Sequence, residues 1–324
     1  MATVIAGQAF AAGLRTEFLK TYDKQYSGLE TISVGMERDV PSDKYQEKFF
    51  YYESAPYMRL WGRGDVMHES HFKGIQWTVT NYEWAESIPW HYADRSDDQT
   101  QSLLARARDL GKNASLLDEQ NFFDILTNTV SSKRLDAIPN CPDGNALYYS
   151  STRFGNAGGN VISGSGVAGP AAVRTDLFSA LERFLDFTDT EGEPLLDQSI
   201  IDQGVTIFAS NEDMNVFEEA FGQKLTTYST VTAGNVAVSN VFQDTNRRPR
   251  VIYTQRLATG DWYVFLNAAP VKPMFSLKRE GIQDVVETFE NSDKVRRTGI
   301  ESIRFWERRG YGLNMPYATI KVNN

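Results

Sequence analysis

The chain has 324 residues, of which 41% are hydrophobic and 23% charged, so it is an ordinary folded protein long enough for about two domains. Its formal net charge of −9 argues against a primary affinity for the nucleic-acid backbone, which needs clustered Lys and Arg. The single cysteine, Cys141, excludes an intrachain disulfide and a cysteine-based zinc cluster, and without a basic start or a long apolar run we expect neither export nor membrane insertion.

The first expected element is an amphipathic helix over residues 10–26. Phe10, Leu14, Phe18 and Tyr22 recur every four residues with charged residues between them, which is the period of one helix face. The polar residues on either side suggest that this helix is a peripheral arm.

A segment dense in aromatic residues follows over residues 48–84. Ile75, Trp77 and Val79 alternate with polar residues, and residues 62–65 (GRGD) are a turn signal. We interpret the segment as a long two-stranded excursion. Because an isolated two-stranded hairpin is marginally stable in water, we expect it to need a partner surface, on its own domain or on another subunit.

A long helix is expected to begin at Asp97 and Asp98 and to continue to about Leu126, which corresponds to about 45 Å. Gly111, near its middle, is a mild objection. The apolar residues of its one face recur at steps of four and three: Leu103, Ala107, Leu110, Ala114 and Leu117.

Residues 138–170 are rich in Gly, Pro, Asn and Ser and are expected to form a loop with one short hairpin. Thr175 or Asp176 then caps a predicted helix, and a turn follows at residues 189–192. The apolar residues of this helix are Leu177, Leu181, Phe184 and Leu185.

A short apolar strand is expected at residues 205–209, followed by a helix that Ser210 or Asn211 caps and that ends at Gly222. Its apolar face consists of Met214, Phe217 and Phe221. Residues 236–322 are mostly strand-like, so the predicted fold class is α+β.

Gly164, Gly166 and Gly169 have the spacing G-x-G-x-x-G, which can let a backbone approach a dinucleotide pyrophosphate. That fingerprint should follow a buried strand in a βαβ unit, but only Val161 and Ile162 precede it here. We therefore favour a flexible connector over a nucleotide site.

Two segments resemble metal sites incompletely. His68, Glu69 and His71 lie near Asp65, but the two histidines are not one helical turn apart as a metalloprotease requires. Residues 186–198 carry acids before a glycine as a calcium loop does, yet Phe187 and Gln198 stand where ligands should be. We expect no metal at either place.

No catalytic residue is predicted. Ser165 lacks the strand-turn-helix setting of a nucleophile elbow, and no basic residue next to Cys141 in sequence would lower the pKa of its thiol. Arg247, Arg248 and Arg250 form a small basic cluster, for which an exposed loop or an acidic subunit contact is favoured over phosphate binding.

Several segments in order along the chain carry a family resemblance: AGLRTEFLKTYD at residues 12–23, the 48–84 excursion, the helix from Asp97, and two C-terminal stretches, DWYVFLNAAPVKPMFSLKRE and RRGYGLNMPYATIKV. With them the sequence resembles the Mu-like major head subunit family of tailed-phage major capsid proteins, which have the Hong Kong 97-type capsid fold. TDLFSALERFLDFTDTEGEPL and GVTIFASNEDMNVFEEAF are similar to the axial domain of such proteins.

The resemblance implies a domain order. Residues 1–46 would form an N-terminal arm and residues 47–90 an extended β-hairpin loop. Residues 91–165 would begin a peripheral domain with a long spine helix. Residues 166–260 would form the axial domain, and residues 261–324 would return to the peripheral domain as C-terminal strands.

The same resemblance implies the function of a major capsid protein without enzyme activity, cofactor or metal. Its copies would self-assemble as hexamers and pentamers into an icosahedral phage or prophage head that encloses double-stranded DNA without sequence-specific binding. Expected partners are a portal, scaffolding, and decoration or protease proteins, with no membrane. Because the chain begins at Met1, we expect scaffolding to be a separate protein.

The expected location is the virion capsid, assembled in the host cytoplasm. Two alternatives stay open. An encapsulin-like bacterial compartment shell shares the fold and would hold cargo proteins instead of DNA. A nucleotide-dependent enzyme using the glycine loop at residues 164–169 is the rival of a different class.

Overall fold

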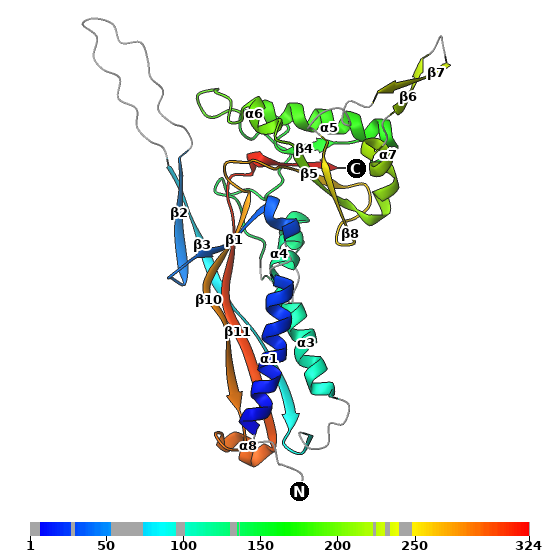
Figure 1. Cartoon of the computed structure of the whole chain (residues 1–324). Helices are drawn as coiled ribbons and strands as arrows, with labels where there is room; N and C mark the ends of the chain where they lie inside the picture. The colour runs from blue at the N-terminus through cyan, green and yellow to red at the C-terminus, as the bar shows by residue number, and fades with distance from the viewer. Residues whose placement is uncertain are drawn as a thin grey trace, which may run out of the picture.

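The computed structural model describes residues 7–26, 30–52, 74–94, 101–129, 135, 137–222, 225–230, 234–239 and 248–323. These residues form an elongated shaft, in which helices lie along a long sheet, and a compact end with a second sheet (Figure 1). The predicted α+β class is confirmed.

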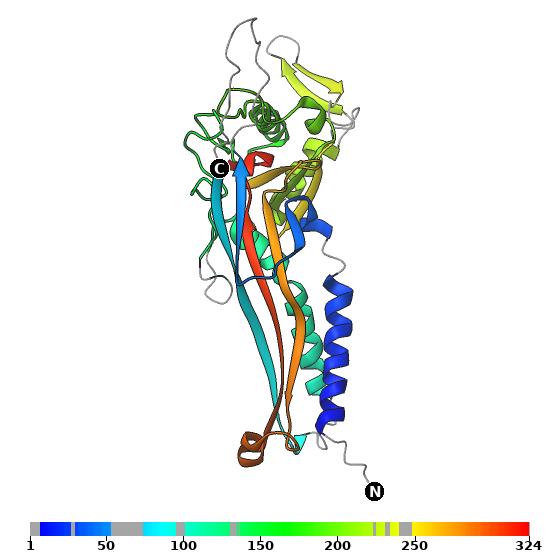
Figure 2. The same ribbon diagram turned by 90° about the vertical axis from the view of Figure 1, so that its left-hand side faces the viewer.

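The long sheet has the strand order β1-β10-β11-β3-β2. All its neighbours are antiparallel except β1 and β10, which are parallel. Figure 2 shows β3, β10 and β11 running side by side along the shaft. The strands are β1 (Met36–Pro41), β2 (Gln46–Tyr52), β3 (Gly74–His91), β10 (Met274–Glu287) and β11 (Ile300–Leu313).

The hairpin of β2 and β3 confirms the two-stranded interpretation of the 48–84 excursion at both of its ends. Phe49 lies opposite Trp77 and Tyr51 opposite Ile75 in an antiparallel register. Residues 53–73, including the GRGD turn signal, lie outside the described residues.

β11 shows why one face of the long sheet is covered by helices. Its odd-numbered residues from Glu301 to Leu313 are all buried, whereas Ser302 to Arg308 at even numbers are exposed or half-buried. This is the period of two expected of a strand with one buried face. Ile303 and Phe305 on that face pack in one core cluster with residues of α1 (Gly7–Tyr26) and α3 (Ser102–Ser115).

The helix expected at residues 10–26 is confirmed as α1, but it does not project as a separate arm. Leu14 and Phe18 are fully buried, and the ring of Phe18 stacks on Phe305 with centroids 3.8 Å apart. α1 lies beside α3 (Figure 2). Gly111 is the reason for the close approach, because a Cβ there would lie 2.6 Å from the carbonyl oxygen of Phe18.

The prediction of one continuous helix from Asp97 to Leu126 is wrong. α3 ends at Ser115, Leu116 has ψ near 2°, and a second helix, α4 (Leu117–Leu126), follows. Most of α4 is buried, on several sides, including the charged Asp118. The break lets the chain turn from the surface of the shaft into the core, where both apolar residues and Asp118 find partners. Asp97 and Asp98 lie outside the described residues.

The compact end contains the second sheet, of strand order β4-β12-β9-β5-β8. β5 and β9 at its centre are buried along their whole length, and α5 (Pro170–Leu185) and α7 (Met214–Gly222) contribute to the same core cluster. The strands are β4 (Val161–Ser163), β5 (Val205–Ser210), β8 (Arg250–Thr254), β9 (Trp262–Leu266) and β12 (Thr319–Asn323).

Two details of the helix predictions need correction here. α5 begins at Pro170 and not after Thr175 or Asp176, because proline suits the first helical position and Gly169 precedes it. Met214 does not belong to the buried face of α7, since its side chain is 47% exposed. The predicted cap at Ser210 is confirmed, because its Oγ accepts from the Glu212 amide.

The remaining elements are short. They are η1 (Glu30–Val34), α6 (Gln198–Ile201), η2 (Asn211–Asp213), β6 (Leu225–Thr230), β7 (Gly234–Ser239), α8 (Asp293–Thr298) and η3 (Pro316–Ala318).

Candidate functional site

The glycine loop at residues 164–169 is packed against β12 at its start. A Cβ at Gly164 would lie 2.5 Å from Val322 Cγ1, so this glycine lets the loop approach β12. The Ser165 amide and Oγ both donate to Asp176 Oδ2, at 3.0 and 2.7 Å. A phosphate would meet a carboxylate here, and Pro170 has no N–H to offer it. The loop therefore connects β4 to α5.

Cys141 is buried, and burial raises the pKa of its thiol to about 12. Arg153 acts on the thiol in the opposite direction, which the sequence did not suggest, but its effect is smaller than that of burial. The guanidinium of Arg153 is engaged by both carboxylate oxygens of Asp143 at 2.7 Å. A thiol held in its protonated form is a poor nucleophile.

The other sequence candidates that the structure describes lie on separate segments of the chain. Residues 188–194 form a turn closed by the bridge between Thr188 and Pro194. Arg248 and Arg250 are exposed near α7. His68, Glu69, His71 and Asp65 lie outside the described residues, as does Arg247.

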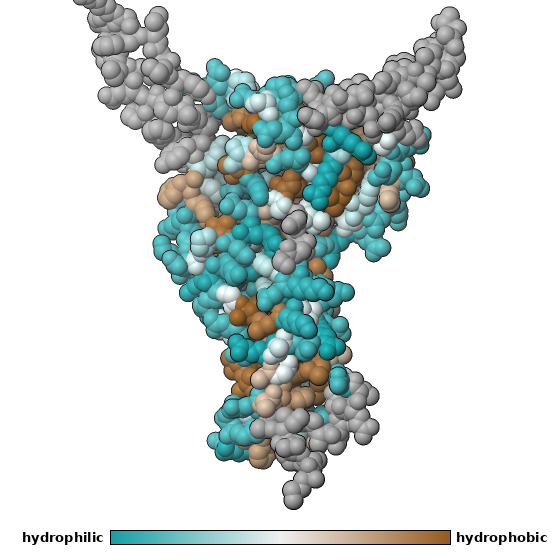
Figure 3. All heavy atoms as spheres, in the orientation of Figure 1, coloured by the Kyte–Doolittle hydropathy of each residue, from teal (hydrophilic) through white to brown (hydrophobic). Residues whose placement is uncertain are grey.

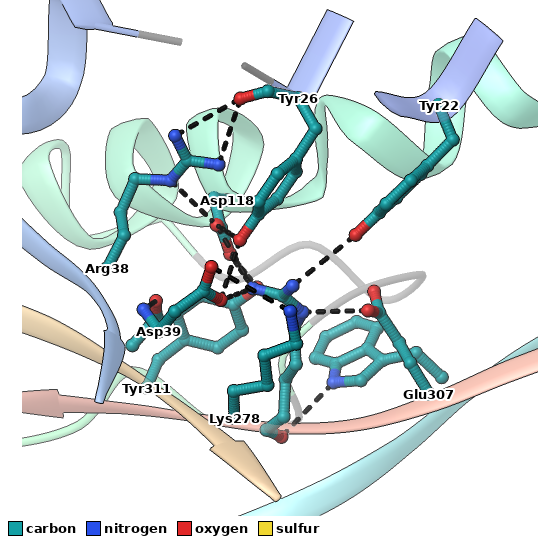
Figure 4. A network of polar contacts seen from close by, with 11 residues as sticks. Tyr22, Tyr26, Arg38, Asp39, Asp118, Lys278, Glu307 and Tyr311 are labelled. Atoms are coloured by element: carbon teal, nitrogen blue, oxygen red, sulfur yellow. Dashed lines mark hydrogen bonds and ion pairs between the residues drawn. The ribbon is translucent and has the colours of Figure 1, made fainter. Parts of the chain in front are cut away.

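The most elaborate polar arrangement in the described structure lies where α1, β1, α4, β10 and β11 meet (Figure 4). We call it the Arg309 network. Its members are Tyr22, Tyr26, Arg38, Asp39, Asp118, Lys278, Glu307, Arg309 and Tyr311.

Arg309 is the centre of this network. Its Nη1 lies 3.1 Å from Asp118 Oδ2 and 3.1 Å from Asp39 Oδ1, and its Nε donates to Glu307 Oε2 at 2.8 Å. The hydroxyl of Tyr311 donates to Asp118 Oδ1 at 2.9 Å. Three carboxylates therefore surround one buried guanidinium, whose planar set of donors suits several carboxylates at once.

A second arginine reaches the same carboxylate from β1. Arg38 Nε donates to Asp118 Oδ2 at 3.2 Å, and both of its terminal nitrogens donate to the Tyr26 carbonyl. Asp39 next to it has a φ of +58°, at the point where the register of β1 against β10 shifts. This left-handed conformation is costly for a residue other than glycine, and the bonds of its carboxylate to Tyr26 and Arg309 compensate.

The electrostatics of the network follow from its burial. Removal from water raises the pKa of Glu307, an effect that Arg309 opposes. Burial by itself would lower the pKa of Arg309, but Asp118 and Glu307 outweigh it, so the guanidinium stays charged. Burial also raises the pKa of Tyr311 well above its ordinary value. Because its charged groups bond mainly to one another, the network joins elements and offers no free nucleophile or base.

Sequence reasoning missed the Arg309 network, although one signal was present. Residues of the strand alternate between a buried and an exposed face, and Ile303, Phe305 and Tyr311 lie on the buried one. Glu307 and Arg309 have odd numbers too, so they lie on the same buried face. Charged residues in a buried phase are paired in nearly all folded proteins. The partner Asp118 could not be found in this way, because a helix that is buried on several sides has no clear polar face.

Within the described ranges, no three His, Cys, Asp or Glu side chains come together as the ligands of a metal would. Across the same ranges, no helix has both the length and the apolar character that a bilayer span requires.

Comparison with protein families gives one match: residues 8–166 match the family described as the Mu-like prophage major head subunit gpT. No curated protein matches the chain.

Among solved structures with a similar fold are two phage capsids and a virus-like particle. The capsid of the cyanophage P-SCSP1u has a TM-score of 0.56 at 13% identity, over 90% of this chain and 86% of that one. The capsid of Myoviridae phage XM1 has a TM-score of 0.56 at 8% identity, over 91% of each chain. A virus-like particle from Pyrococcus furiosus has a TM-score of 0.53 at 10% identity, over 97% of this chain and 99% of that one.

Proposed function

We propose how this chain, as a major head protein of the tailed-phage type, builds a shell. Its identification rests on the match of residues 8–166 to the Mu-like prophage major head subunit and on the capsid fold. The β2–β3 hairpin is the part that contacts a neighbouring copy. The shell encloses double-stranded DNA without sequence-specific binding. The net charge of −9 suits this role, because an acidic shell repels the DNA backbone weakly.

The observation that carries this proposal is the exposure of aromatic side chains at the hairpin. Phe50 on β2 is 64% exposed, and Tyr45 just before β2 is 61% exposed. Exposed aromatic residues on a narrow element that leaves the body of the protein mark a surface that a partner covers. The space-filling view shows that the body is wide at the compact end and narrows along the shaft (Figure 3).

We further propose a division of the chain into capsid regions. α1, α3 and the long sheet form the peripheral region, and α5, α7 and the second sheet form the axial region. β9 and β12 are counted in the axial region because both belong to the sheet of β5. Both strands fall in the range 261–324, which the resemblance assigned to the peripheral domain. The long strands of that range, β10 and β11, do belong to the peripheral region. The hairpin from β2 to β3 is the extended loop.

The chain acts as a structural protein without catalysis of its own, in line with the structural role of the family it matches. The engaged donors of the glycine loop and the buried thiol of Cys141 support this reading. Its place is the virion capsid, formed in the host cytoplasm. Portal, scaffolding, and decoration or protease proteins are its expected partners.

The test is electron microscopy with size-exclusion chromatography of the purified chain, alone and co-expressed with the products of its neighbouring genes. We expect closed shells, or stable hexamers and pentamers. A monodisperse monomer or dimer under both conditions would overturn the proposal. Shells that enclose protein cargo and no DNA would instead indicate an encapsulin-like compartment, and stoichiometric binding of NAD or ATP would support the enzyme alternative.

The role of the hairpin has its own test, deletion of residues 54–72. We expect the shortened chain to remain folded and to form no particles. Particles in normal yield would reject the hairpin as a subunit contact.

A further inference from the structure

Asn81 marks the place where the hairpin leaves the shaft. From Asn81 to His91, β3 pairs with β11, and from Gly74 to Thr80 it pairs with β2. β3 therefore changes its partner strand at this residue. Beyond it, within the described residues, β3 pairs only with β2 (Figure 1). Phe49 and Trp77 of the hairpin pack against the cluster of Phe275, and Tyr51 and Ile75 pack against the core of the compact end. The direction in which the hairpin leaves therefore depends on these contacts and on how the chain is held at Asn81.

The turn that leads into the hairpin, residues 42–45, is held by Asn81 from one side. The Asn81 Nδ2 donates to Ser42 Oγ and to the Lys44 carbonyl, both at 2.7 Å. Its backbone amide donates to the Tyr45 carbonyl at 2.9 Å. With Asn81 only 2% exposed, these bonds are shielded from competing water.

Glu47 holds the same turn from the other side. Its Oε1 accepts from the backbone amides of Asp43 and Lys44 and from Ser42 Oγ, each at 3.1 Å. The Ser42 hydroxyl thus accepts from Asn81 and donates to Glu47, so the two side chains act through one continuous set of bonds. We call Ser42, Glu47 and Asn81 the turn clasp.

The turn clasp is fixed to the shaft on two further sides. A Cβ at Gly310 would lie 2.9 Å from Asn81 Oδ1 and 2.7 Å from the Thr80 carbonyl, so only glycine lets β11 approach this closely. The Ser42 amide donates to the Lys278 carbonyl at 3.3 Å. Three residues before the turn, Asp39 is held in its left-handed conformation by the Arg309 network.

We propose that Glu47 and Asn81 are positioning residues for shell assembly: they fix the angle at which the β2–β3 hairpin leaves the shaft, and so the place where its aromatic side chains meet a neighbouring copy of this chain. The inference rests on the proposed role of the hairpin as a subunit contact. If the turn at residues 42–45 were not held, the hairpin would sample a wider range of directions, and the entropy lost when a neighbouring copy orders it would weaken assembly.

The test compares Glu47→Ala with Glu47→Gln, which keeps an acceptor oxygen, and with Glu37→Ala. Glu37 is an exposed acid on β1, so its substitution changes the net charge equally and is a matched control. For each full-length subunit we would measure the unfolding temperature, amide hydrogen exchange at Asp43 and Lys44, and particle yield and diameter by electron microscopy.

We expect Glu47→Ala to keep the unfolding temperature, because Glu47 is only half-buried, while exchange at Asp43 and Lys44 accelerates by about tenfold. Particle yield should fall by a similar factor, with misassembled products. Glu47→Gln should retain most of the yield, and Glu37→Ala should behave as the unmodified chain.

Normal particles from Glu47→Ala despite fast exchange would overturn the positioning role, and unchanged exchange would show that Glu47 does not hold the turn. If Glu47→Ala fails to fold, Ser42→Ala, which interrupts the same set of bonds by removing one hydroxyl, is subject to the same criteria. Loss of particles on deletion of residues 54–72, with normal particles from Glu47→Ala, would keep the hairpin contact and reject only the positioning inference.

Discussion

Arg309 Nη1 and Asp118 Oδ2 lie 3.1 Å apart inside the protein, in an ion pair whose side chains are each 1% exposed. The pair joins β11 to α4 across 191 positions of the chain. A carboxylate removed from water needs a charged partner, so the buried position of α4 depends in part on Arg309 of β11. The pair thus ties the two parts of the sequence that make the shaft.

We expect Asp118→Ala to lower the free energy of unfolding by about 3–5 kcal/mol, because it leaves the charge of Arg309 buried with fewer partners. Urea unfolding of the soluble subunit measures this. Arg108→Ala is the control, since it removes an exposed arginine paired with Glu17 at 2.8 Å, and it should have little effect. Equal urea midpoints for the two variants would contradict the structural role of the pair.

The elements of this fold with a clear period could be predicted from sequence. α1 and α7 lie close to their expected positions because one face of each is apolar and the other polar, and β5 does so because its short, mainly apolar run is buried throughout. The hairpin was found at both ends for the same reason. The break at Leu116 could not be foreseen, because the apolar steps from Leu103 to Leu117 continue across it and only the packing of Asp118 requires the turn.

The polar sites were the least predictable part of the molecule. The turn clasp joins Ser42 and Glu47 to Asn81, and the Arg309 network joins residues from both ends of the chain. Sequence spacing shows neither, because strand pairing between distant segments brings these side chains together. The candidates that the sequence did offer, such as Ser165 and Cys141, depend on local patterns. In the structure Ser165 donates a hydrogen bond to Asp176, and Cys141 is buried.

Gly111 and Gly13 allow a matched comparison between two helical glycines. A Cβ at Gly111 would lie 2.6 Å from the Phe18 carbonyl of α1, whereas a Cβ at Gly13 would have no atom within 4 Å. Gly13→Ala should raise the free energy of unfolding by about 0.5–1 kcal/mol through helix propensity. Gly111→Ala should lower it by about 1–3 kcal/mol, because α1 and α3 must separate. Chemical denaturation that gives both changes the same sign would refute this account of the packing.

The thiol of Cys141 should react with a disulfide reagent only when the protein unfolds. Burial raises its pKa from 9.0 to about 12, so at pH 8 the folded protein holds almost no thiolate. Because the folded pKa lies above the unfolded one, this group also makes folding stability fall as pH rises from 9.0 toward about 12. Labelling with a chromogenic reagent at pH 8, with Cys141→Ser as the blank, should follow the rate of unfolding in urea. Rapid labelling of the folded protein would show that the thiol is accessible.

Gly312, in the Gly-Tyr-Gly motif near the C-terminus, has a packing role that can be tested against Gly281. A Cβ at Gly312 would collide with the ring of Phe275 and lie 2.8 Å from Val79 Cγ2, so this glycine seats the apolar cluster of Val79, Phe275 and Leu277 beneath the root of the hairpin. A Cβ at Gly281 would meet only the end of the Lys278 side chain, at an ordinary 3.5 Å. We expect Gly312→Ala to lower the free energy of unfolding by about 1–3 kcal/mol and Gly281→Ala to leave it nearly unchanged.

Urea unfolding of both subunits measures this difference, and particle yield provides a second reading of the Gly312→Ala variant. Because Phe49 and Trp77 of the hairpin pack against this cluster, the variant should lose particles at temperatures where its unassembled subunit is still folded. If Gly312→Ala matches Gly281→Ala in both stability and yield, the ring of Phe275 has room to move aside, and the motif has no packing function at this position.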